Sequence, residues 1–284
     1  MPAPSSAPGQ ALPLLGCDFS SSPSKRKTIV NAWGSVRAGV LCLDGLERFD
    51  TLHAWAHGLC QGSWFGGFDL PFGLPRALVQ ALNWPLEWAA CMDHYARLPR
   101  SEIRDAFAAF CDARPAGGKF AHRATDGPAG SSPSMKWVNP PVAYMLHAGV
   151  PLLRQAQAYF PGLQAAQRDA QRVALEAYPG LLAREILGTR SYKSDTPAKQ
   201  NSERLIARKD LLTALELGQT RLDLRLRLSH AQRDALAQDP SGDALDAVLC
   251  LVQAAWAQRR YGAGDPLCGL PPDLDPLEGW ILSA

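Results

Sequence analysis

Acidic residues stand at the ends of several short apolar segments of this chain and at the start of one helix, where a charge contributes little to a core. They are Asp18 in LLGCD, Asp69 in WFGGFD, Glu176 in VALE, and the pair Asp243 and Asp246 in SGDALDA. Asp and Glu are almost never fully buried without a partner. A fold that buries the apolar segments must therefore bring these carboxylates to a place where cations or solvent reach them.

The apolar segments alternate between strand and helix signals. Short apolar runs bounded by turn residues predict strands over 12–19, 28–36, 38–43, 64–70 and 173–178. Apolar residues at helical spacing predict helices over 49–58, 76–112, 152–172, 181–187, 203–217 and about 242–259. Ser241 is the expected N-cap of the last helix. The order strand, strand, strand, helix, strand indicates an α/β protein.

Bulk composition excludes several classes of protein. The net charge of +2, from 29 basic and 27 acidic residues, means that any nucleic-acid contact must come from a local basic patch. Seven cysteines with no CxxC spacing argue against a zinc site or a disulfide framework and favour a reduced, cytoplasmic protein. No apolar run approaches the ~18 residues of a membrane span, so no membrane association is expected.

The acids predict a divalent-metal site. If Asp18 and Asp69 end neighbouring parallel strands, two like charges converge, and Mg²⁺ or Mn²⁺ neutralises such a pair with oxygen ligands. Asp243 and Asp246 are three residues apart, so they share one helix face. Two ions roughly 3.5–4 Å apart would activate water and stabilise the leaving oxygen of a phosphodiester.

Each acid also has an ordinary explanation. A single Asp at a strand end is usually a turn or cap residue, and Asp243 alone suits a charge in the first turn of a helix. Glu176 could pair with Arg172 or Arg184. The metal hypothesis rests on the whole set of acids, with Asp18 at its centre. Glu176 is expected to adjust the properties of the site or to hold a basic residue.

Five motifs occur in one order along the chain. They are Gly16-Cys17-Asp18, Phe68-Asp69-Leu70-Pro71, Glu176-Ala177-Tyr178-Pro179, Tyr192-Lys193, and Asp243 to Ala247. In this order they resemble the ribonuclease-H-like superfamily, and in particular its predicted-nuclease family called domain of unknown function 429, a relative of RuvC-type resolvases. The resemblance implies a mixed five-stranded sheet with strands 1-2-3 antiparallel, helices on both faces and a helical insertion. It also implies that both acids of the last helix belong to the site.

The resemblance divides the chain into three parts. Residues 1–11, rich in Pro, Ser and Ala, are expected to be a disordered lead-in. Residues 12–262 would form the ribonuclease-H-like domain, with the helical and loop insertion at about 76–172. Residues 263–284, rich in Pro and Gly, are expected to be a surface tail.

The expected function is metal-dependent hydrolysis of phosphodiester bonds in DNA or RNA, including branched or structured forms, with Mg²⁺ or Mn²⁺ as cofactor. The expected catalytic residues are Asp18, Asp69, Glu176, Asp243, Asp246 and Lys193, and the expected metal ligands are Asp18, Asp69, Asp243 and Asp246. Lys193 would contact a phosphate or stabilise a transition state. The sequence specifies no oligomeric state.

Two alternatives stay open. The run from Gly16 to Ser22 also resembles the first strand of actin-like and sugar-kinase phosphotransferases, which usually need two copies of the fold and Gly-rich phosphate loops. A non-catalytic nucleic-acid-binding module is the other alternative, although a binder of polyanions gains nothing from clustered carboxylates.

Overall fold

The computed structural model describes residues 11–167 and 169–284. Except for residue 11, the expected disordered lead-in lies outside the described residues. The strands are β1 (Leu14–Asp18), β2 (Ile29–Arg37), β3 (Val40–Phe49), β4 (Trp64–Asp69), β5 (Arg172–Glu176) and β6 (Leu226–Arg227). The helices are α1 (Leu52–Leu59), α2 (Arg76–Ala81), α3 (Trp88–Arg97), α4 (Arg100–Asp112), α5 (Asp126–Ala129), α6 (Val142–Gln155), α7 (Pro179–Leu187), α8 (Ser202–Leu217), α9 (His230–Gln238) and α10 (Asp243–Gly262), with a 3₁₀ turn, η1, at Pro197–Lys199.

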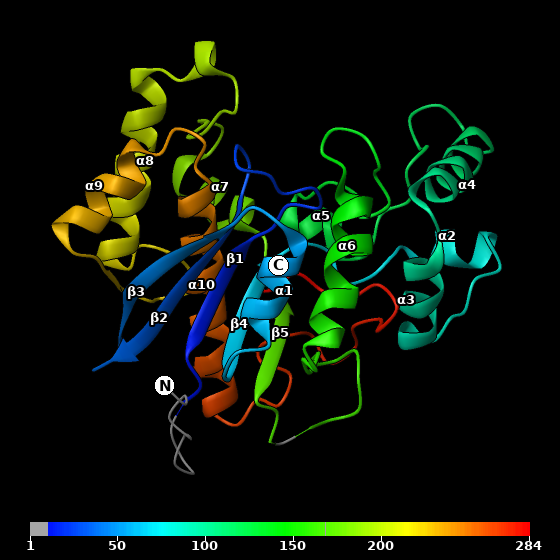
Figure 1. The fold of residues 1–284 in the computed structure, drawn as a ribbon, viewed down its shortest axis with the longest axis horizontal. Coiled ribbons are helices and arrows are strands. Elements are labelled where there is room, and N and C mark those ends of the chain that lie inside the picture. The colour runs from blue at the N-terminus through cyan, green and yellow to red at the C-terminus, as the bar shows by residue number, and fades with distance from the viewer. Residues whose placement is uncertain (1–10, 168) are drawn as a thin grey trace.

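The strands form one mixed sheet in the order β5-β4-β1-β2-β3-β6 (Figure 1). Strands β1, β2 and β3 are antiparallel, whereas β4 is parallel to both β1 and β5. The α/β class and the antiparallel 1-2-3 arrangement are confirmed. The expected number of five strands is wrong, because β6 extends the edge by pairing with β3 in parallel. Strand β6 has only two residues, too few to give a strand pattern in the sequence.

The β2–β3 hairpin differs from the sequence prediction in one detail. Ala38 and Gly39 both have positive φ, as a tight hairpin turn requires. Asp44-Gly45, a pair whose composition is typical of a turn and which follows the strand predicted over 38–43, lies inside β3. The pairing passes from Trp33↔Gly45 to Gly34↔Leu43, so Asp44 is the extra residue of a β-bulge. The Asp-Gly pair, which is common in turns, therefore forms a bulge within a strand here.

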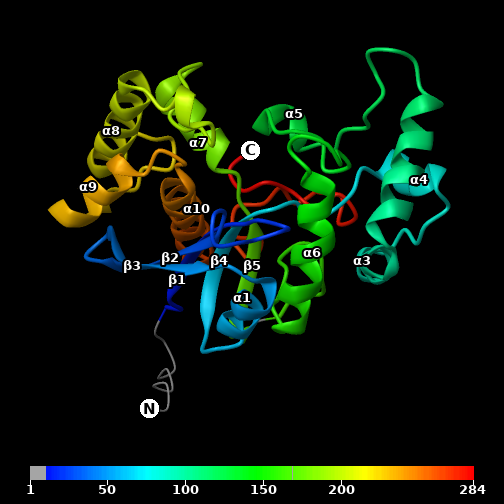
Figure 2. The same ribbon diagram turned by 45° about the horizontal axis from the view of Figure 1, so that its top comes forward.

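Helices cover both faces of the sheet (Figure 2). Helix α10 packs along β1, β2 and β4, with α7 against α10, α8 against α7, and α9 against α8. On the opposite face, α1 contacts β3 and α6, and α6 contacts α3. The two faces carry separate apolar clusters, one around Leu14 and Leu251 and the other around Leu15 and Trp55. Successive side chains of β1 point to opposite faces of the sheet, so β1 contributes residues to both clusters.

The helix expected at 152–172 is wrong in position. Helix α6 begins at Val142 and ends at Gln155, with Pro151 inside it. Its buried residues Ala143, Leu146, Val150 and Leu153 recur at helical spacing, and their burial outweighs the hydrogen bond that proline removes. The sequence assigned no element to 218–241, where β6 and α9 lie.

The last segment, residues 263–284, is more than a surface tail. Leu277, Ile281 and Leu282 are buried, and the Leu282 N–H donates to the Glu176 carbonyl oxygen at 2.8 Å. This segment therefore packs into the protein and bonds the last residue of β5. None of the helices in residues 11–167 and 169–284 is long and apolar enough to cross a membrane.

Candidate active site

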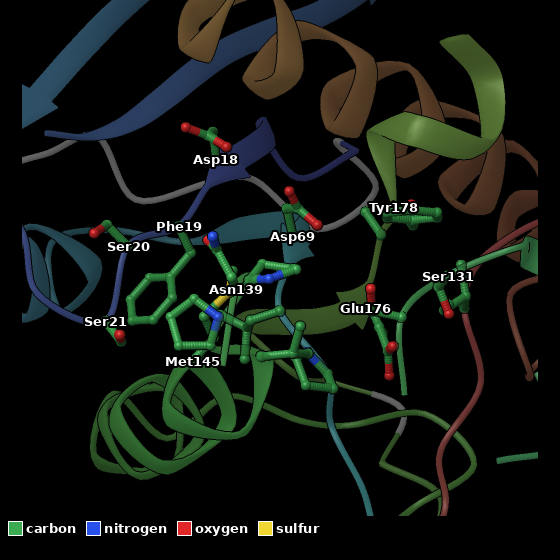
Figure 3. A pocket seen from close by; sticks show the side chains of 18 of the residues that line it. Asp18, Phe19, Ser20, Ser21, Asp69, Ser131, Asn139, Met145, Glu176 and Tyr178 are labelled. Carbon is green, nitrogen blue, oxygen red and sulfur yellow. The ribbon is translucent and has the colours of Figure 1, made fainter. Parts of the chain in front are cut away.

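Two of the expected site residues lie side by side at the carboxyl edge of the sheet. Strands β1 and β4 are parallel, and their pairing sets Asp18 opposite Asp69. Both side chains line the same cavity and lie near each other (Figure 3). The predicted convergence of these two carboxylates at adjacent strand ends is what the register shows.

Glycines in β1 and β4 let α10 approach the sheet closely. A Cβ on Gly16 would lie 2.1 Å from the Ala247 carbonyl oxygen and 2.2 Å from the Leu251 nitrogen. A Cβ on Gly67 would lie 2.7 Å from the Cys250 carbonyl oxygen. Because no larger residue fits either gap, these glycines bring the first turn of α10 to the strand ends that carry the acids.

The first turn of α10 contributes Asp243 and Asp246, which are both buried. The expected N-cap, Ser241, is displaced by Gly242, which has a φ of 75° and no side-chain capping bond. Asp239 instead accepts the Ala244 N–H at 3.2 Å and the Ser241 hydroxyl at 2.7 Å. The helix therefore begins without a side-chain cap of its own, and its first turn carries the two acids.

Two lysines pair with the helix acids. Lys27 Nζ lies 2.6 Å from Asp243 Oδ1, and Lys193 Nζ donates to Asp246 Oδ2. The Tyr192 hydroxyl donates to the other oxygen of Asp246, Oδ1, at 2.5 Å. Both oxygens of Asp246 are thus engaged, whereas Asp243 holds a single lysine that is itself partly exposed.

The acids disfavour one another's charge. Burial raises the pKa of Asp18 well above its ordinary value, and Asp246, Asp243 and Asp69 raise it further. Burial and the charge of Asp246 raise the pKa of Asp69 to about 7. Among the described residues, no donor hydrogen-bonds to the side chain of Asp18 or Asp69. The site therefore holds negative charge that its own lysines neutralise only in part.

Glu176, at the end of β5, lies in a different environment from the aspartates. Arg123 grips it with two hydrogen bonds, from Nη2 to Oε1 at 2.7 Å and from Nη1 to Oε2 at 2.8 Å. The Phe72 N–H donates to Oε2 at 2.9 Å. Arg123 also bonds Asp126, and all three charged side chains are almost fully buried. These contacts tie the insertion to the sheet and favour a positioning role for Glu176.

The partners of Glu176 proposed from the sequence are both wrong. Arg172 donates instead to the carbonyl oxygens of Cys60, Gly62 and Ala156, and Arg184 to that of Ala129. Arg123 lies 53 positions before Glu176 in a stretch without regular pattern, so no local spacing could reveal the pair.

A cavity of about 420 Å³ opens above the acids. Its lining comes from the turn after β1, the end of β4, the start of α6, the β5–α7 junction, the Lys193–Asp195 loop and the tail. Asp18, Asp69, Glu176, Lys27 and Lys193 all line it. Asp243 and Asp246 are not part of the lining, but the lysines that they bond, Lys27 and Lys193, are.

A comparison with protein families assigns the chain to a known group. A family model described as "Protein of unknown function (DUF429)" matches residues 16–268. The chain belongs to this family. The match spans the sheet, the helical insertion and α10, so the insertion is part of the DUF429 region. No curated protein and no solved structure matches the chain.

The chemistry of this DUF429 site suits a hard divalent cation. Within residues 11–167 and 169–284, no group of three or more His, Cys, Asp or Glu side chains is close enough to hold a metal by itself. The free carboxylates of Asp18 and Asp69 are nevertheless oxygen ligands of the kind that Mg²⁺ and Mn²⁺ take. Asp243 would join them by exchanging its bond to Lys27. Asp246, with both oxygens engaged, is better placed to hold Lys193.

The sequence hypothesis missed two residues of the site. Tyr192 was recognised only as part of a motif, yet its hydroxyl fixes one oxygen of Asp246. Arg123 lies outside all five motifs, and it is the buried partner of Glu176. The aromatic residues Trp64, Phe65 and Phe72, in and beside β4, are all buried and so belong to the core rather than to the lining that a substrate base could stack on.

Proposed function

We propose that the protein is a metal-dependent nuclease of the ribonuclease-H-like class that hydrolyses phosphodiester bonds in DNA or RNA. The observation that carries the proposal is the in-register pair of Asp18 and Asp69 beneath a cavity, with the acids of α10 beside them. Uncompensated carboxylates at parallel strand ends cost stability, and such a cost persists where it serves function. A divalent cation offsets it.

The sheet supports the same class. A mixed sheet with an antiparallel 1-2-3 unit, followed by strands parallel to the first, is the arrangement that the motif resemblance implies. Five motif acids reach one edge of this sheet, four of them close enough for their charges to shift the pKa of Asp18 or Asp69. Fold alone does not establish activity, so the proposal rests on the site.

The residues have distinct parts in the proposed reaction. Asp18, Asp69 and Asp243 would hold Mg²⁺ or Mn²⁺, which activates water and stabilises the charge on a leaving oxygen. Lys193, held by Asp246, presents an ammonium group toward the cavity where a phosphate would gather negative charge. Glu176 and Arg123 hold the wall of the cavity in place.

A second candidate is the small-molecule phosphotransferase. Ser20 and Ser21, which follow Asp18, line the cavity and suit contact with a phosphate. Against it, the described part of the chain forms one sheet and lacks the second copy of the fold that actin-like kinases use. A non-catalytic binding module would leave the paired carboxylates without a purpose.

The test is cleavage by purified protein of single-stranded, duplex and branched DNA and RNA, with Mn²⁺, Mg²⁺ or a chelator. We expect metal-dependent cleavage, lowered on the order of 100-fold or more by Asp18→Asn or Asp69→Asn, since the metal contributes several kcal/mol to such reactions. Asp112→Asn, in an exposed acid of α4, is the matched control. Absence of cleavage on every substrate, together with turnover of a nucleoside triphosphate, would replace the nuclease by the phosphotransferase.

A further inference from the structure

Four basic side chains beside the cavity have no carboxylate partner in residues 11–167 and 169–284. They are Lys25, Arg26, Arg100 and Arg204. Other cations of the same region are paired: Arg48 of β3 bonds Asp239, and Arg190, at the start of the loop between α7 and α8, bonds Asp210. The positive charge of the four is therefore available to an anion from outside the chain.

Two of these cations stand at the tip of a tight turn that follows β1. The Ser24 N–H donates to the Lys27 carbonyl oxygen at 2.8 Å, and the Lys27 N–H donates back at 3.1 Å. Lys25 and Arg26 are the two residues between them, and both are exposed. Lys27, at the base of the turn, lines the cavity and bonds Asp243. One turn thus carries one cation into the site and two cations to its rim.

Arg100, the first residue of α4, is held against the same turn. Its Nη2 donates to the Ser21 carbonyl oxygen at 2.8 Å, and its Nη1 donates to the Ser22 hydroxyl at 3.1 Å. The guanidinium group also lies over the Tyr144 ring, 5.0 Å from the ring centre. Because Ser21 lines the cavity, Arg100 lies at its rim. A guanidinium group that is already oriented loses little freedom when it binds a phosphate.

Arg204, in the first turn of α8, lies beside the other lysine of the site. Its Nη1 donates to the Ser191 hydroxyl at 3.0 Å and to the Lys193 carbonyl oxygen. Lys27 Nζ lies 3.3 Å from Asp195 Oδ1 and so joins the turn after β1 to the Lys193–Asp195 loop. Both segments rise above the sheet edge at which β1 ends (Figure 1). The four unpaired cations therefore follow one side of the cavity, from α4 over the turn to α8, and we call them the basic rim.

Resting on the proposed function, we infer that the basic rim binds the phosphates that neighbour the cleaved one, and that the substrate is a nucleic-acid strand that extends beyond the cavity. The net charge of the chain is only +2, so a polyanion must be held by a local patch of this kind. Lys and Arg contact phosphates whatever the base, so binding should be independent of sequence and should weaken as salt is added. These cations need no metal, so binding can be measured apart from cleavage.

The first experiment measures the affinity of a labelled single-stranded oligonucleotide by fluorescence anisotropy, in chelator, over a series of salt concentrations. On a single strand, each phosphate contact contributes about 0.7 to the slope of the logarithm of affinity against the logarithm of salt concentration. The double variant Lys25→Gln, Arg26→Gln should bind more weakly and lose about 1.4 from this slope, and Arg100→Gln should lose about 0.7. Slopes equal to that of the wild type in these folded variants would overturn the inference.

The matched control removes two positive charges from the opposite edge of the sheet. Arg225 and Arg227 are exposed and lie in and beside β6, which pairs with β3 at Leu41 and Cys42. The double variant Arg225→Gln, Arg227→Gln changes the net charge as much as the rim variant does. It should keep the affinity and the slope of the wild type. An equal loss in both double variants would show that net charge alone sets the affinity and would overturn the inference.

Cleavage in Mn²⁺ distinguishes failure of the rim from failure of the proposed activity. A wild type that cleaves strands, with rim variants that bind them as tightly, would overturn the inference and leave the nuclease proposal standing. Binding through the rim without cleavage of any strand would overturn the nuclease proposal and leave the rim as a binding surface. A polyglutamate chain that displaces the labelled strand as well as an unlabelled strand does would assign the rim to acidic proteins and overturn the inference.

Discussion

Asp18 and Asp69 sit opposite each other in the pairing of two parallel strands, and no described residue hydrogen-bonds to either side chain. Asp246 of α10 raises the pKa of both carboxyl groups, and Asp243 raises that of Asp18. A sheet edge built in this way is less stable than one with neutral residues there. The proposed divalent cation would offset this repulsion.

The pH dependence of stability should report this repulsion in metal-free protein. The ordinary pKa of an aspartate is 3.8, and that of Asp69 is raised to about 7 in the fold. The folded state keeps a proton that the unfolded chain has lost, so Asp69 lowers stability as the pH rises from about 4 to about 7. Asp69→Asn should therefore gain stability over the wild type across this window.

Urea unfolding in chelator, at several pH values, measures the difference. Asp112→Asn, exposed on α4, should follow the wild type throughout. A constant difference between Asp69→Asn and the wild type from pH 4 to pH 7 would contradict the raised pKa.

Metal binding should stabilise the fold independently of any activity. A ligand at 100 times its Kd adds about 2.7 kcal/mol to the free energy of unfolding. We expect Mn²⁺ to raise the Tm of the wild type and to leave that of Asp18→Asn nearly unchanged, as measured by calorimetry. Equal increases in both proteins would place the ion away from Asp18.

The close approach of β1 and α10 predicts an asymmetric effect of two similar substitutions. In Gly16→Ala, the new methyl group would lie 2.1 Å from the Ala247 carbonyl oxygen, so strand and helix must separate. Overpacking of a core typically costs about 1–3 kcal/mol, and backbone atoms yield least. In Gly45→Ala, the methyl group meets nothing within 4 Å.

Thermal unfolding of the two variants, with Mn²⁺ affinity measured beside it, tests this packing. Gly16→Ala should lose both stability and metal affinity, because α10 carries Asp243 and Asp246. Gly45→Ala should keep both. A Gly16→Ala protein as stable as the wild type would show that the approach of α10 is not limiting.

The sequence predicted the parts of the site that depend on local pattern. Apolar runs of four or five residues located the strands that end at Asp18 and Asp69, and parallel pairing then made the two acids neighbours. Spacing of three placed Asp243 and Asp246 on one helix face. Each inference needed only the periods of strand and helix and the rule that parallel strands end at one edge.

What the sequence did not predict depends on contacts between distant segments. The ion pair between Arg123 and Glu176 joins an irregular loop to a strand, and β6 is too short to leave a pattern. Helix α6 contains Pro151, which local rules take as a boundary. Tertiary burial decided these cases, and it is not encoded in any window of neighbouring residues.

Lys193 should matter for both the site and the fold. Its ammonium group bonds Asp246, which is fully buried, so Lys193→Met leaves that carboxylate with Tyr192 alone. We expect a loss of about 1–3 kcal/mol, less than the ~3–5 kcal/mol of a fully buried pair because the Lys193 side chain is 41% exposed. The proposed hydrolysis should slow on the order of 100-fold through loss of charge stabilisation.

Lys199→Met, at an exposed position in the same loop, is the control for Lys193→Met. Urea unfolding and cleavage rates, both measured on folded protein, separate the two effects. A Lys193→Met protein that loses stability but cleaves at the wild-type rate would confine Lys193 to holding Asp246.

Because Arg123 and Glu176 bond each other in the core, we expect substitutions of either residue to lower the stability of the fold more than the rate of the proposed cleavage. Both side chains are at most 3% exposed, so Arg123→Met leaves Glu176 and Asp126 as buried charges without their partner, at a cost of about 3–5 kcal/mol. Glu176→Gln keeps the volume and one acceptor but removes the charge pair, so it too should destabilise the protein. The double variant should lose less than the sum of the two single changes, because the second substitution removes a charge that the first left unpaired.

Cleavage at a temperature where each variant is folded then distinguishes the roles of Glu176. A positioning residue that Arg123 holds should cost the reaction little once the fold is intact, and Glu176→Gln should keep most of its rate. If Glu176→Gln were instead as stable as the wild type and lost cleavage as fully as Asp18→Asn, Glu176 would act on the reacting groups directly. Arg123 would then serve to set its charge rather than to anchor the insertion.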